Sequence, residues 1–152
     1  MSFGAAVYGS LLVASVVGIA YEAGQSAATM TATAASSMVV FWAAHTWSEA
    51  LGERVAAGPA FRRRDILVVA RHEWPLVEAA VLPTLCLALA WAGAWSREAG
   101  TRAALGAALL QIVGWGIVAG LRSGASPIAA AVMGAGEGAL GLALLALERF
   151  VH

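Results

Sequence analysis

The side chains of this sequence that could bind a proton or a cation are a histidine and a few carboxylates set within long apolar stretches. His45, Glu49 and Glu53 follow one another at intervals of four residues, which places them on one face of a helix. Glu137 lies in the middle of another apolar stretch, four residues after Met133. Ionisable groups at membrane depth cost about 2.5–3.5 kcal/mol each on insertion scales, so they are functional candidates by default.

Two further carboxylates, Glu73 and Glu78, flank the start of a third apolar stretch. Imidazole and carboxylate ligands suit divalent transition metals such as Fe, Mn or Zn, and a thioether adds a weak preference for softer metals. The same imidazole and carboxylates suit a proton relay. The predicted metal or proton pathway therefore consists of His45, Glu49, Glu53, Glu73, Glu78, Met133 and Glu137.

Each of these residues also has a purely structural interpretation. Glu49 and Glu78 lie close enough to a membrane surface to snorkel, and Arg54 or Arg71 could neutralise them. His45 could serve only to hydrogen-bond a neighbouring helix. Glu137 has no Arg or Lys within two turns of its own helix, so it is protonated, paired across helices or a ligand.

Other chemistries find no support in the sequence. The segment that begins at His72 has His-Glu but lacks the second histidine of a zinc-protease motif. The sole aspartate, Asp65, lies in an arginine-rich segment, and the sole cysteine, Cys86, lies in an apolar run. There is no lysine and no basic face suited to nucleic acid. We therefore expect neither an enzyme, nor a covalently bound cofactor, nor a nucleic-acid partner.

The composition predicts which elements carry these residues. Of 152 residues, 61% are apolar and 12% are charged, against about 45–50% and about 25% in soluble domains. Stretches of about 20 apolar residues are long enough to cross a bilayer as helices. We predict an all-α, polytopic membrane protein of one domain, with about five spans near residues 4–20, 27–51, 74–95, 103–121 and 128–147.

The remaining segment, 52–73, is an arginine-rich linker that places five of the nine arginines on one side of the membrane. Because positively charged loops stay in the cytoplasm, the N-terminus is expected inside and the C-terminus outside the plasma (cytoplasmic) membrane. Gly58-Pro59 should end the preceding helix. The apolar run Ile66–Ala70 is typical of a short helix at the membrane interface or of a lead-in to the third span. Pro83 should kink that span.

Glycines at four-residue spacing occur late in the chain. Gly116 and Gly120 form one such pair, and Gly134 and Gly138, with Gly141 three residues further on, form a second row. In lipid, close approach of small faces supplies the contact between helices. These faces are expected either to hold two subunits together or to pack within one chain.

This layout resembles the vacuolar iron transporter family, in Tyr8–Leu11, in the Gly/Ala-rich first two spans and above all in Gly116–Pro127. The resemblance implies five spans, an inside N-terminus, a homodimer and an ion path between the two subunits, which would bring His45 and Glu49 of both chains together. The sequence departs from the family in two respects. Tyr8 stands where the family has an acidic residue, and a short arginine-rich linker replaces its Glu-rich metal-collecting insert.

Two functions follow as hypotheses. The first is a transporter or channel for a divalent transition-metal cation, with or without proton coupling. The alternative is a non-transporting membrane scaffold that binds a partner protein or lipid, for which the arginine linker could dock on anionic lipid. A proton or anion pathway through the same carboxylates is a weaker third hypothesis.

Overall fold

The computed structural model describes residues 2–58 and 62–151, and the side chains of these residues except 144, 145 and 147–151. Within these residues all regular secondary structure is helical, which confirms the all-α prediction. The elements are α1 (Phe3–Glu22), α2 (Ala27–Ala57), α3 (Arg63–His72), α4 (Pro75–Trp91), α5 (Arg97–Arg122) and α6 (Pro127–Val151).

Three of these helices, α1, α2 and α5, are long and apolar enough to cross a membrane. The pair α3 and α4 makes a fourth candidate if the two helices, which meet at an angle of 42°, form one broken span. Helix α6 is apolar from Pro127 to Ala143, a stretch too short by itself to count as a span, and most side chains beyond Ala143 lie outside the described ones. The described helices thus support a membrane protein with transmembrane helices, whereas a fifth span at α6 stays a prediction.

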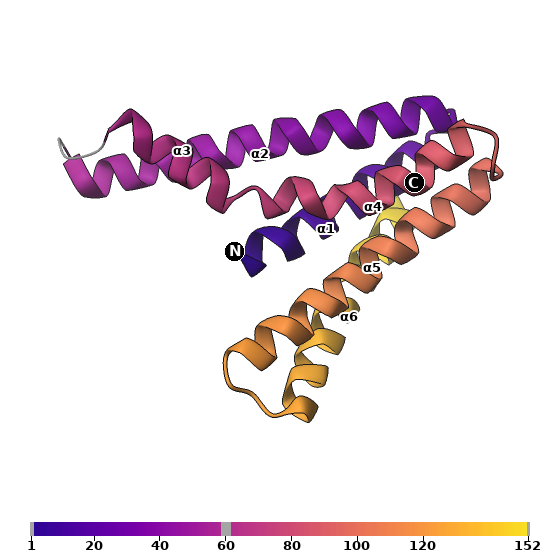
Figure 1. Cartoon of the computed structure of the whole chain (residues 1–152). Coiled ribbons are helices and arrows are strands. Elements are labelled where there is room, and N and C mark those ends of the chain that lie inside the picture. The colour runs from indigo at the N-terminus through magenta and orange to yellow at the C-terminus, as the bar shows by residue number, and fades with distance from the viewer. Residues whose placement is uncertain (1, 59–61, 152) are drawn as a thin grey trace.

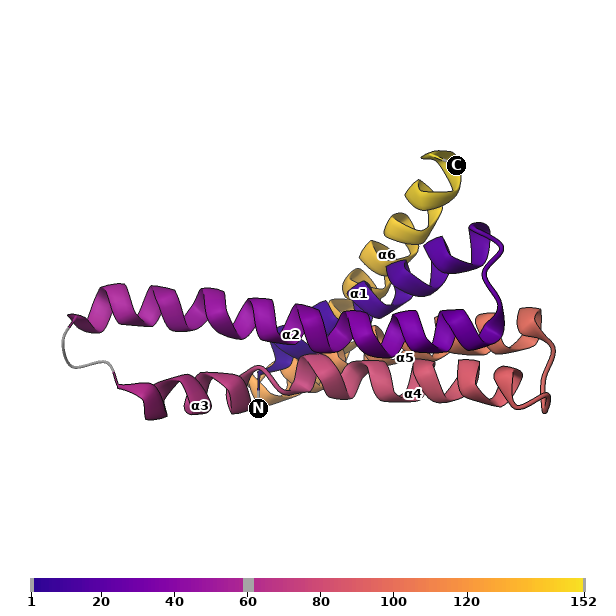
Figure 2. The ribbon, with the colours of Figure 1, turned by 90° about the horizontal axis from the view of Figure 1, so that it is seen from above.

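Helix α1 lies at the centre of the bundle, packed mainly against α4 and α5 and less extensively against α2. Helices α2 and α4 run side by side in opposite directions, and α3 lies beside the far half of α2 (Figure 2). Helices α5 and α6 form a hairpin that diverges from α2 and α4 (Figure 1). The core between these elements is built from buried apolar side chains, including Val13, Val17, Met30, Met38, Leu76 and Leu87.

Glycines allow the helices to approach each other closely. A Cβ atom on Gly9 of α1 would lie 2.5 Å from the carbonyl oxygen of Leu76 in α4. A Cβ atom on Gly134 of α6 would lie 2.7 Å from the carbonyl oxygen of Val113 in α5. The predicted glycine rows of α5 and α6 therefore pack against each other within one chain, which is one of the two roles expected for them.

The segment predicted as a linker is mostly helical. Helix α2 continues past the predicted end at Leu51 to Ala57, and Gly58, with φ of +57°, ends it. The helix break at Gly58 is confirmed, while Pro59 lies outside the described residues. The predicted short helix at Ile66–Ala70 is part of the longer α3. Helices α2 and α3 pack against each other and leave the arginines of this segment exposed.

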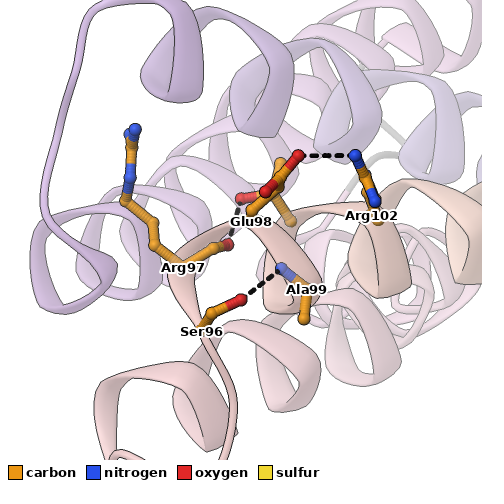
Figure 3. Close-up of polar contacts among 6 residues, drawn as sticks. Ser96, Arg97, Glu98, Ala99 and Arg102 are labelled. Carbon is orange, nitrogen blue, oxygen red and sulfur yellow. Dashed lines mark hydrogen bonds and ion pairs between the residues drawn. The ribbon is translucent and has the colours of Figure 1, made fainter.

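Two other boundaries differ from the predicted ones. Helix α4 continues through Pro83 and ends at Trp91, before a glycine turn at Gly93 with φ of +80°. Helix α5 begins six residues before the predicted start at Ala103, because the hydroxyl of Ser96 accepts a hydrogen bond from the backbone N–H of Ala99 (Figure 3). The first turn of α5 is consequently charged and exposed.

The close contact between α5 and α6 gives a test of the packing. Gly134→Ala should lower the free energy of unfolding by about 1–3 kcal/mol, because its Cβ would collide with backbone atoms of α5. Gly136→Ala, on the same helix with no atom within 4 Å of its Cβ, is the matched control and should be neutral or stabilising by up to about 1 kcal/mol. Unfolding of the purified variants in mixed micelles measures both. Equal effects of the two substitutions would contradict the packing described.

Candidate functional site

An open groove of about 250 Å³ lies between α1, α5 and α6. Most of its wall is apolar, and its polar groups are the phenol of Tyr8 and the carboxylate of Glu137, with the thioether of Met133 beside them. The groove is lined by Phe3, Gly4, Val7, Tyr8, Leu11, Gly116, Ala119, Met133 and Glu137. Two residues of the predicted pathway, Met133 and Glu137, thus share one cavity.

The position of Glu137 depends on a glycine of the neighbouring helix. Its side chain passes over Gly116, where a Cβ atom would lie 3.1 Å from the Cγ of Glu137. Glu137 is half-buried, and within the described part of the chain no basic side chain lies at ion-pair distance from it. A carboxylate in an apolar groove without a counter-charge favours binding a proton or a cation.

Apart from the groove, a pair of polar side chains lies at the junction between α3 and α4. The imidazole Nε2 of His45, in α2, is 3.3 Å from a carboxylate oxygen of Glu73. The side chain of Glu73 is 8% exposed and that of His45 is 37% exposed, so this contact is partly shielded from its surroundings. It is an ion pair when the imidazole is protonated. The contact with Glu73 fits both interpretations of His45: a bond to a neighbouring segment of the bundle, and a group that binds a proton or a cation.

Two tryptophans hold α2 against this junction. The indole N–H of Trp42 donates a hydrogen bond to the carbonyl oxygen of Ala70, at 2.9 Å. The rings of Trp42 and Trp74 meet edge to face, with centroids 5.4 Å apart. These contacts fix α2 relative to the end of α3, and so they position His45 opposite Glu73.

Tyr8 lies between the groove and the His45–Glu73 pair. Its ring is 5.9 Å from the imidazole of His45, centroid to centroid, and its side chain also lines the groove of Glu137. From the sequence, an isolated tyrosine in a span is more often a helix-to-helix contact than a ligand. The position of Tyr8 follows from how α1 is aligned against α2 and α6. That alignment cannot be predicted from a single sequence.

The other predicted residues lie apart from these two pairs. Glu49 and Glu53 are exposed on α2, and Glu78 is exposed on α4. Among residues 2–58 and 62–151, with the side-chain exceptions given above, no three His, Cys, Asp or Glu side chains are grouped closely enough to hold a metal ion. The predicted row of groups therefore divides into two pairs, His45–Glu73 and Met133–Glu137, with three separate carboxylates.

The charged residues at the start of α5 are more exposed than Glu73 and Glu137. Glu98 forms an ion pair with Arg102 one turn away, and both side chains are more than half exposed (Figure 3). Glu22, at the end of α1, is also exposed. Both carboxylates lie at the surface, and their exposure distinguishes them from Glu73 and Glu137.

No protein-family model, no curated protein and no solved structure matches this chain. The resemblance to vacuolar iron transporters therefore stays a prediction, and so do the roles of the individual residues.

The contact between His45 and Glu73 can be measured by a double-mutant cycle. His45→Ala should lower the free energy of unfolding by about 1–3 kcal/mol, because it leaves the buried Glu73 carboxylate without its partner. His45→Ala combined with Glu73→Ala should cost less than the sum of the single substitutions. Glu49→Ala, an exposed carboxylate on α2, is the control and should stay within about 0.5 kcal/mol of the parent. Additive effects at His45 and Glu73 would show that the pair contributes nothing.

Proposed function

We propose that this protein is a membrane transporter or channel for a divalent transition-metal cation, with Glu137 as the residue that binds the cation within the membrane. The observation that carries the proposal is the half-buried carboxylate of Glu137 in an open groove, without a basic partner among the described residues. Keeping such a group in a membrane costs free energy, and a cation or a proton that binds it offsets that cost.

The depth of Glu137 supports this role. Glu137 follows Pro127, the first residue of α6, by ten residues, which corresponds to about 15 Å along the helix. The hydrocarbon core of a bilayer is about 30 Å thick. If α6 is a span, which the proposal includes as the last of five, the carboxylate lies close to the middle of the membrane.

The ligands near the groove suit a metal cargo. Glu137 supplies carboxylate oxygens, Met133 a thioether and Tyr8 a phenolic oxygen. His45 and Glu73, on the other side of Tyr8, supply an imidazole and a second carboxylate. Mixed nitrogen and oxygen ligands favour ions such as Mn, Fe or Zn over Ca or Mg. The cation is a substrate here, passing from one pair of ligands to the other beside Tyr8.

A homodimer with an ion path between its subunits belongs to the same proposal. One chain offers two pairs of ligands, and a second copy doubles the number of carboxylates available. Much of α2 faces outward, with buried side chains at a few positions only, Met30, Ala34, Met38, Thr46 and Ala50. This leaves a wide surface on which a second copy can pack. The predicted orientation, N-terminus inside and arginine-rich segment in the cytoplasm, places the His45–Glu73 pair on the cytoplasmic half.

Metal binding should depend on Glu137. Mn, Fe, Zn, Co or Ni, at about a hundredfold excess over its dissociation constant, should raise the melting temperature of the purified protein by about 5–10 °C. Glu137→Gln should abolish the shift, because it removes the anionic ligand but keeps the shape. Glu98→Gln, at the exposed ion pair of α5, is the control and should keep the shift.

Transport itself is measured in liposomes that hold a metal-sensitive dye, with and without a pH gradient. The parent protein and Glu98→Gln should admit the metal, and Glu137→Gln should not. An anomalous-scattering map of crystals soaked in the metal should show a peak in the groove. Absence of uptake and of any thermal shift in the parent protein would overturn the proposal and favour the non-transporting scaffold.

A further inference from the structure

The far end of α2 and the whole of α3 form a basic arm, defined here as residues 51–58 and 62–72. The arm carries Arg54, Arg62, Arg63, Arg64 and Arg71 against Glu53 and Asp65, a formal charge of +3 (five minus two) in a chain whose net charge is 0. Among the described residues only Arg64 of these five has a carboxylate within ion-pair distance, Asp65 at 3.9 Å. The arm therefore concentrates positive charge that the chain itself leaves without a partner.

An apolar crevice adjoins the arm and is partly lined by it. A cavity of about 40 Å³ lies between α2 and α3, lined by Trp47, Ala50, Leu51 and Ile66, with Arg54 as its one charged member. Two of the lining residues, Trp47 and Leu51, form a row with Val55 at four-residue spacing, and the three are 66%, 53% and 79% exposed. An apolar crevice with a guanidinium beside it matches an amphiphile that has an acyl chain and an anionic head.

The position of Arg54 relative to the bundle fits a lipid headgroup. Tyr8 lies five residues into α1 and contacts His45, so His45 lies about 8 Å inside the level at which α1 begins. Arg54 follows His45 by nine residues, about 13 Å along α2 in the outward direction. Arg54 thus lies about 6 Å beyond the start of α1. With the start of α1 at the edge of the hydrocarbon core, as the proposed first span places it, Arg54 falls within the headgroup layer, which is about 5–8 Å thick.

Helix α3 adds a second surface of the same kind. Leu67 and Val68 are 63% and 66% exposed. Arg63 and Arg64 lie one turn before them, and Arg71 lies one turn after Leu67. Exposed apolar side chains between arginines are typical of helices that insert shallowly into anionic membranes.

From this arrangement we infer that the basic arm binds an anionic phospholipid of the membrane in which the protein lies. An acyl chain packs in the crevice between α2 and α3, the phosphate meets the guanidinium of Arg54, and the arginines of α3 contact neighbouring headgroups. The site is independent of the proposed cation pathway, because it shares no residue with the groove of Glu137 or with the His45–Glu73 pair.

The test compares phosphatidylglycerol with phosphatidylcholine, added to the purified full-length chain in mixed micelles. Phosphatidylglycerol should bind more tightly and raise the melting temperature more, and the difference should shrink as salt is added. Arg54→Gln should weaken phosphatidylglycerol binding about fivefold, since one arginine near an anionic surface contributes about 1 kcal/mol. Arg102→Gln, an exposed arginine on α5 outside the arm, is the matched control and should bind like the parent.

Three outcomes would overturn the inference. The first is equal stabilisation by the two lipids, and the second is an unchanged affinity in Arg54→Gln. The third is full competition by glycerol 3-phosphate, which would assign the site to a free phosphate. Because six tryptophans fluoresce, Trp47→Phe locates the lipid: brominated phosphatidylglycerol should quench the parent more than this variant. Equal quenching would place the lipid away from the crevice and would also count against the proposal.

Discussion

Close contact between helix backbones at glycines is the constraint on which the rest of this structure depends. Gly9 brings α1 against Leu76 of α4, Gly100 brings α5 against α4, and Gly134 brings α6 against α5. In lipid the hydrophobic effect does not draw helices together, so the contact must come from van der Waals packing over small residues. A methyl group at these positions would meet backbone or neighbouring side-chain atoms at 2.5–2.7 Å. Each of the three interfaces is therefore set by the absence of a side chain.

The same contacts decide where the polar groups lie. Helix α6 packs mainly against α5 and only slightly against α1, so a groove remains where α1, α5 and α6 separate. Gly116 leaves room for the side chain of Glu137 in that groove. On the other side of α1, Trp42 and Trp74 hold α2 to the α3–α4 junction and thereby set the distance between His45 and Glu73. Tyr8 adjoins both places because α1 lies between them.

Much of this fold could be predicted from single residues and local spacing. Ser26 and Ser126 accept hydrogen bonds from the N–H groups of the first turns of α2 and α6, which is a local property of the sequence. The extension of α2 to Ala57 is missed when the span is bounded by its apolar residues, although Glu53–Ala57 is rich in strong helix formers. The His45–Glu73 pair could not be predicted: four-residue spacing indicates which face His45 occupies, but not which helix faces it. The exposed position of Glu78 likewise depends on how α4 is rotated against its neighbours.

The central place of α1 has a consequence for biosynthesis. Its main partners, α4 and α5, begin at Pro75 and Arg97, so Gly9 emerges from the ribosome well before Leu76 does. At about 5–20 residues per second, that interval lasts roughly 3–13 s. During this time the small-residue surface of α1 has only α2 beside it, and other membrane proteins or lipids have access to it. Insertion of α4 thus begins to cover this surface of α1, and α5 and α6 complete the packing. Any factor that shields nascent helices would act before then.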